Sequence, residues 1–136
     1  WVRAMITASI VVVMLVYHLL LSGSVRDDFW WQLADTTLHY VDPLVYVVWW
    51  IVAQAHGALK WTDLPRMLIY PGFYLIWVLA RGAVATIYPY PFIDVAALGY
   101  GQVLLNAAGV LAAFVLFYAA AIGIDRWLGR KALRAV

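Results

Sequence analysis

A few polar side chains stand at or beside the ends of long apolar segments, and these are the residues that could do chemistry. His18 lies near the end of the first apolar segment, and His39 lies at the start of the second, with Asp42 three residues later. An imidazole titrates near neutral pH, so it can take up and return a proton during a reaction. A carboxylate beside it can fix its tautomer, as in hydrolase triads. Ionisable groups at membrane depth are costly and mark functional sites by default.

Further polar and aromatic candidates follow in the second half of the chain. Arg81 ends the third apolar segment and could bind an oxyanion or a fatty carboxylate. Residues 88–92 (YPYPF) form a stiff, extended segment because each proline disfavours helix in the residue before it, and Asp94 follows. Gln102 and Asn106 are spaced to share one helix face. The candidates for orienting a base or binding a substrate are therefore His18, Asp42, Arg81, Tyr88, Tyr90, Asp94 and Asn106.

Each candidate also has a purely structural explanation. A histidine near a helix end often only forms a hydrogen bond at the membrane interface. Asp42 could cap the start of a helix, and Arg81 could reach a lipid phosphate. Gln102 and Asn106 could serve only to link helices. His56 falls in a predicted inner loop, where no special role is expected for it.

Several classes of active site have no sequence support. The motifs of GxSxG hydrolases, zinc proteases and nucleotide-binding proteins are absent. The chain has no cysteine, which excludes disulfides, thiolate metal sites and a Cys nucleophile. His18 and His39 lie on different segments without metal-ligand spacing, so no metal site is predicted. A histidine in a membrane could ligate haem or a chlorophyll-type pigment, but no accompanying motif supports this, and no cofactor is expected.

The composition is that of an integral membrane protein. Of the 136 residues, 67% are hydrophobic and 12% are charged, whereas soluble domains average about half apolar and about a quarter charged. Mean hydropathy is +0.88, and the eight Trp and nine Tyr suit positions at lipid headgroups. The net charge is only +2, with basic residues scattered or near the C-terminus, so nucleic acid is not a predicted partner.

The predicted fold is an all-α integral membrane protein, a single domain with a bundle of four transmembrane helices. A helix needs roughly 20 apolar residues to span a bilayer. The predicted spans are about 4–21, 37–54, 64–82 and 99–124. Pro65 suits the first turn of the third helix, and Pro71 predicts a kink within it.

The distribution of basic residues predicts the orientation. Seven of the nine lie at one set of helix ends: Arg3, Lys60, Arg66, Arg126, Arg130, Lys131 and Arg134. Arg26 and Arg81 lie at the other set. The positive-inside rule then places both termini and the 55–63 loop in the cytoplasm, and the 22–36 and 82–98 loops outside. The candidate residues are therefore expected to converge on one outward-facing pocket.

Several strings, in order along nearly the whole chain, resemble the bacterial branch of the androgen-induced family of membrane proteins. They are residues 16–21 (VYHLLL), 38–44 (LHYVDPL), 79–83 (LARGA), 88–95 (YPYPFIDV), 98–100 (LGY) and 104–106 (LLN). The His-x3-Pro and YPYPF-x-D strings are the most specific parts of this resemblance.

The resemblance implies a multi-pass protein of the bacterial inner membrane, usually of six helices. It also implies hydrolysis of lipid esters, such as fatty acid esters of hydroxy fatty acids, by an intramembrane threonine and a histidine. His39, in its Leu-His-x3-Pro context, matches that histidine. The threonine lies on an early helix of the family, so this chain would correspond to the family from its third helix on, without about two spans. Thr36 and Thr37 do not match the motif of the nucleophile.

Two functions are consistent with these features. One is a lipid-ester hydrolase with His39 as general base, for which membrane lipids and a lipid ester are the partners. The other is a non-catalytic accessory subunit that packs against other transmembrane subunits of a respiratory or photosynthetic complex. Transport has less support, because the sequence has no internal symmetry and few buried charges.

Overall fold

The computed structural model describes residues 1–24 and 28–134, and every regular element in this part is a helix. The helices are α1 (Val2–Leu20), α2 (Phe29–Thr36), α3 (Asp42–Ala53), α4 (Leu64–Met67), α5 (Ile69–Ala85) and α6 (Val95–Arg134). A π-turn, Thr37–Val41, joins α2 to α3, and 3-10 turns lie at Ser22–Ser24, Trp61–Asp63 and Pro91–Ile93. The all-α prediction is confirmed.

Three helical segments are long and apolar enough to cross a membrane: Val2–Leu20, Trp61–Ala85 and Val95–Lys131. They correspond to the predicted first, third and fourth spans. The predicted second span, 37–54, is not one of these three. It belongs to a helical run that starts earlier, at Phe29, and consists of α2 with eight residues, the π-turn with five and α3 with 12.

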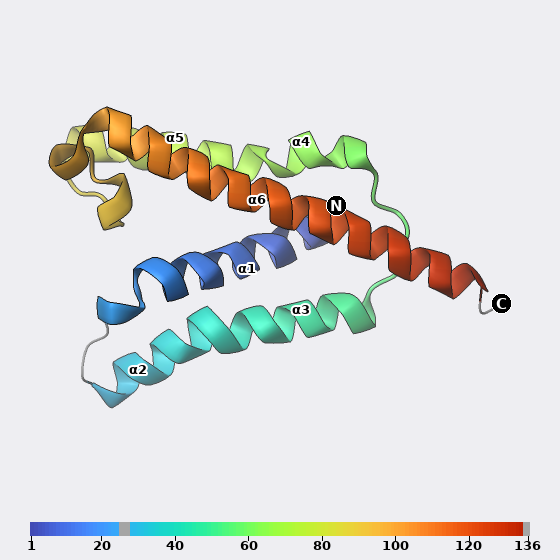
Figure 1. Cartoon of the computed structure of the whole chain (residues 1–136). Helices are drawn as coiled ribbons and strands as arrows, with labels where there is room; N and C mark the ends of the chain where they lie inside the picture. The colour runs from blue at the N-terminus through green and yellow to red at the C-terminus, as the bar shows by residue number, and fades with distance from the viewer. Residues whose placement is uncertain (25–27, 135–136) are drawn as a thin grey trace.

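The long helices are neighbours in the order α3, α1, α6, α5 (Figure 1). Small side chains of α1, Ala4 and Ala8, are buried in the same cluster as the aromatic ring of Tyr118 from α6. Small residues four apart allow two helices to approach closely. A hydrogen bond of 2.8 Å between the hydroxyls of Ser9 and Tyr118 adds a buried polar link between the same helices.

Glycine and proline set two of the helix boundaries. Pro65 stands in the first turn of α4, as predicted, where its missing N–H costs nothing. The helix is interrupted at Leu68, three residues before Pro71, in agreement with the predicted kink. Gly99 has φ 74° and ψ 159°, so the first turn of α6 is separated from its long remainder. The predicted fourth span, 99–124, lies within α6, which begins before Gly99 and continues to Arg134.

A buried carboxylate ties the segment between α3 and the 61–63 turn to α6. Asp125 is 3% exposed. Its Oδ2 accepts hydrogen bonds from the backbone N–H groups of Gly57 (3.0 Å) and Leu59 (2.9 Å), and its Oδ1 lies 3.1 Å from His56 Nδ1. Gly129 is packed so closely there that a Cβ would fall 2.4 Å from the Gly57 Cα. His56 thus has a structural role that the sequence did not indicate.

Candidate functional site

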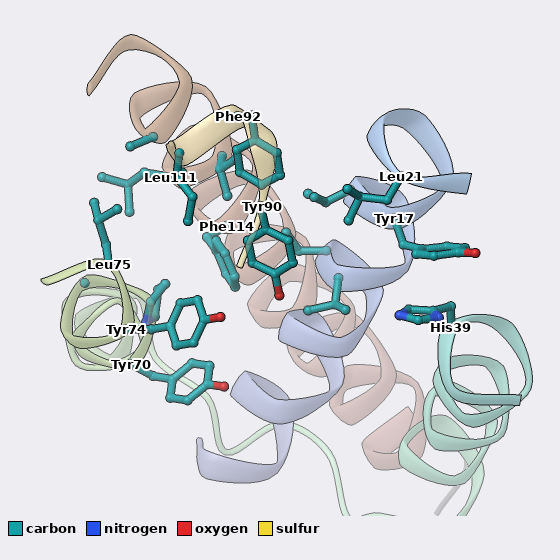
Figure 2. Close-up of a pocket in the computed structure, with 18 residues that line it drawn as sticks. Tyr17, Leu21, His39, Tyr70, Tyr74, Leu75, Tyr90, Phe92, Leu111 and Phe114 are labelled. Atoms are coloured by element: carbon teal, nitrogen blue, oxygen red, sulfur yellow. The ribbon is translucent and has the colours of Figure 1, made fainter. Parts of the chain in front are cut away.

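An apolar cavity of about 300 Å³ lies among α1, α5, α6 and the 90–93 segment (Figure 2). Residues of α1 from Val12 on, and Leu21 directly after the helix, line it over a length of about 14 Å at a rise of ~1.5 Å per residue. One leaflet of a bilayer contributes roughly half of a hydrocarbon core of about 30 Å. The cavity is therefore lined by apolar side chains along about one leaflet's length of the chain.

His39 stands at the margin of this cavity. Its ring stacks on the Tyr17 ring, with centroids 3.8 Å apart and planes 9° apart. Its Nδ1 lies 3.0 Å from the backbone oxygen of Asp35 and 3.1 Å from the Oδ1 of the same residue. The Tyr17 hydroxyl donates a hydrogen bond to Oδ2 of Asp35. Figure 2 shows the Tyr17 and His39 rings on one side of the α1 ribbon and the rings of Tyr74 and Tyr90 on the other.

The π-turn that carries His39 is explained by the proline that follows it. Pro43 has no N–H, and in a regular helix its ring would press on the carbonyl of His39, four residues earlier. The wider turn shifts the hydrogen bonding by one residue, so that the Asp42 N–H bonds to the Thr37 carbonyl. Single π-turns inside helices occur often at functional sites. Pro43 thus puts His39 in a local irregularity of the helix, at the margin of the cavity.

Tyr90 is the other predicted site residue that lines the cavity, and Asn106 holds the segment that contains it. Tyr90 lines the cavity and stacks on Phe92, with ring centroids 5.3 Å apart. Asn106 Nδ2 donates to the Phe92 carbonyl at 2.8 Å. Gln102 Nε2 donates in turn to Asn106 Oδ1 at 2.9 Å. The pair on α6 therefore holds the YPYPF segment against the helix, as a link between two parts of the chain.

Tyr88 packs outside the cavity, against α5. A Cβ at Gly82 would lie 2.0 Å from a ring carbon of Tyr88, so the ring occupies the space that only a glycine leaves. Desolvation raises the pKa of the Tyr88 hydroxyl, and the nearby Tyr100 and Asp94 raise it further. The phenol is therefore neutral at physiological pH, and its role in the structure is packing.

The remaining candidates lie at the same end of the molecule without lining the cavity. Asp94 caps the start of α6, since its Oδ1 accepts from the N–H groups of Ala96 and Ala97 at 2.9 and 3.1 Å. His18 is exposed, with Nδ1 3.0 Å from the hydroxyl of Tyr40. Asp42 and Arg81 are also exposed. The predicted outward position of Arg26 falls outside the described residues.

Asp35 is the carboxylate that contacts His39, in place of Asp42 or Asp94. The sequence prediction missed it because the second helix was taken to start at residue 37. The signal was Asp28, whose Oδ1 accepts from the N–H groups of Trp30 (2.9 Å) and Trp31 (3.1 Å) and so begins the helix at residue 29. With that start, Asp35 and His39 are four residues apart on one helix.

No group of three metal-ligating side chains comes together within the part of the chain that the structure describes. Comparison with protein-family models, with curated proteins and with solved structures gives no match.

Proposed function

We propose that this chain binds the acyl chain of a lipid ester in the cavity between α1, α5 and α6 and hydrolyses the ester with His39 as general base. The supporting observation is the position of an imidazole, in contact with a carboxylate, at the margin of an apolar cavity of one leaflet's length. The resemblance to the androgen-induced family, in which His39 matches the histidine of lipid-ester hydrolases, supports the same role.

The depth of the lining residues suggests how a substrate would lie. Tyr17, Leu21 and His39 line the outer end of the cavity, whereas Val12 and Phe114 line its deeper part. An acyl chain bound along α1 would bury its hydrocarbon against these apolar side chains, at about 25 cal/mol per Å² removed from water. Its ester group would then be at the outer end, near the imidazole.

In the proposed reaction, a water molecule is the nucleophile that attacks the ester. His39 takes a proton from water as the water oxygen bonds to the ester carbonyl carbon, which gives a tetrahedral oxyanion and an imidazolium. Collapse of this intermediate breaks the bond between the carbon and the alkoxy oxygen, and the imidazolium returns its proton to the leaving alcohol. A threonine of the kind that the resemblance implies would take the place of water in the first step. Among the described residues, no threonine hydroxyl is hydrogen-bonded to His39.

The proposal includes the membrane topology. The run from α2 to α3 crosses the membrane in addition to the three long apolar helices. The end of the bundle that carries His39 faces outward from the bacterial inner membrane. Support comes from the opposite end of the molecule, where the start of α1, the 54–60 segment and the C-terminal part of α6 lie together (Figure 1). Most of the basic residues are at that end, which the positive-inside rule assigns to the cytoplasm.

Ester turnover by the purified protein in lipid nanodiscs tests the proposal. His39→Gln is expected to lower the rate by about 10²–10⁴, the usual contribution of a general base. His18→Gln is the matched control, because His18 is exposed and contacts Tyr40 outside the cavity. Turnover that is lost equally in both variants, or retained in His39→Gln, would contradict the assignment of the base.

A non-catalytic subunit is the second candidate function. Apolar side chains are exposed on α3 and α5, the two outermost of the four long helices. The exposed fraction is 89% for Val84 of α5 and 78% for Val52 of α3. Other transmembrane subunits could cover these faces, although lipid would cover them equally well. Native electrophoresis in a mild detergent distinguishes the two, since a subunit would migrate with larger partners and an independent enzyme would not.

A further inference from the structure

Asp35 and Tyr17 form one cluster with the His39 ring and connect α1 to the turn before α3. We propose that both are positioning residues, which hold His39 as the tautomer with its hydrogen on Nδ1 and so keep Nε2 available as the base. The role of Nε2 as a base rests on the proposed function. The tautomer itself does not.

The partners of Nδ1 determine the tautomer. A neutral imidazole has one nitrogen that donates and one that accepts. Nδ1 faces two oxygens of Asp35, the backbone carbonyl at 3.0 Å and the carboxylate Oδ1 at 3.1 Å, and both of these can only accept. The hydrogen of the neutral ring is therefore on Nδ1, and the lone pair is on Nε2. Within the described residues, no hydrogen bond engages Nε2.

Tyr17 constrains both partners of this pair. Its hydroxyl donates to Asp35 Oδ2, so the two carboxylate oxygens have separate partners and the carboxylate is held in one orientation. Its ring covers one face of the imidazole. Tyr17 is only 7% exposed, whereas the side chains of His39 and Asp35 are 28% and 23% exposed. The residue from α1 thus supplies the buried support for a ring that is itself partly exposed at the margin of the cavity.

The charge and the hydroxyl in this cluster can be removed separately. Asp35→Asn keeps the size of the side chain but replaces one acceptor by an amide that can donate, which favours the opposite tautomer, as in hydrolase triads. Tyr17→Phe keeps the stacked ring and removes only the hydroxyl that engages Oδ2. Asp42→Asn is the matched control, since Asp42 lies on the same helical run but is exposed.

Nitrogen NMR of the full chain, labelled with ¹⁵N-histidine in nanodiscs, measures the tautomer directly. The chain has three histidines, and His39→Gln identifies the signals of His39. We expect the Nδ1–H form to dominate in the wild type and in Asp42→Asn, and to lose population in Asp35→Asn and, less strongly, in Tyr17→Phe. A dominant Nε2–H form in the wild type, or an unchanged population in both cluster variants, would overturn the inference. If Asp35→Asn does not fold, Tyr17→Phe carries the test.

Ester kinetics separate positioning from a merely structural role. We expect kcat to fall about 10²–10³-fold in Asp35→Asn, less than in a protease triad because the backbone carbonyl still accepts from Nδ1, with KM changed less than about twofold. An increase in KM at constant kcat would contradict the positioning role. A wild type without ester turnover would refute the proposed function, whereas the tautomer measurement would still decide the role of Asp35 and Tyr17.

Discussion

Replacing Asp125 by alanine is expected to release the segment between α3 and the 61–63 turn from α6 and to destabilise the protein. The carboxylate accepts from Leu59 N–H at 2.9 Å, from Gly57 N–H at 3.0 Å and from His56 Nδ1 at 3.1 Å. Asp125→Ala removes all three contacts at once. His56 keeps one partner, because its Nε2 lies 3.0 Å from the Ile51 carbonyl oxygen.

The loss of stability in Asp125→Ala depends on which of the N–H donors can find a new hydrogen-bond partner. Gly57 is exposed, so water can replace the carboxylate there, but Leu59 is buried and its N–H would be left unsatisfied. A buried unsatisfied donor costs about 1–3 kcal/mol, and each hydrogen bond to a charged group contributes roughly 1.5–3 kcal/mol. One unsatisfied donor and one lost hydrogen bond to a charged group together amount to about 2.5–6 kcal/mol of unfolding free energy. This range includes the roughly 3–5 kcal/mol measured when one partner of a buried charged pair is removed.

Two assays check this prediction. Denaturant unfolding in detergent micelles, followed by Trp fluorescence, measures the loss of stability. Trypsin cleavage after Lys60, which is exposed beside this segment, measures its release. Asp42→Ala is the control, because the exposed Asp42 should change stability by less than about 0.5 kcal/mol. If Asp125→Ala had the same stability and the same cleavage rate as Asp42→Ala, the inference that the Asp125 carboxylate holds this segment against α6 would be wrong.

Three further outcomes follow from the cavity and its surroundings. Gly82→Ala should destabilise the protein by about 1–3 kcal/mol, because the new Cβ would lie 2.0 Å from the Tyr88 ring; in a double-mutant cycle, adding Tyr88→Ala should recover most of this loss. Asn106→Leu should lower the free energy of unfolding by roughly 1–2 kcal/mol, since it removes the donor that satisfies the Phe92 carbonyl; thermal unfolding measures this loss. Ala107→Phe places a ring in the cavity, so it should raise KM for a long-chain ester about tenfold or more while leaving a short-chain ester unaffected; equal effects on both esters would argue against an acyl site.

Local features of the sequence were sufficient for several elements. Pro65 stands in the first turn of a helix, where its missing N–H predicted it. The start of the second helix was misplaced because its cap, Asp28, was not taken into account. The i,i+4 pair of Gln102 and Asn106 was found from spacing alone, whereas its target, the Phe92 carbonyl, was not.

The sequence by itself determined that the chain is all-helical and holds helices long and apolar enough to cross a membrane, because hydropathy and helix length are local properties. It also singled out His39. Only the tertiary structure decided what surrounds that histidine and where the cavity lies. Tyr17 and Asp35 are 18 residues apart in sequence, and His56 and Asp125 are 69 apart. Such pairs depend on which faces of neighbouring helices meet, and helices that are apolar on every side carry little periodic signal to indicate this.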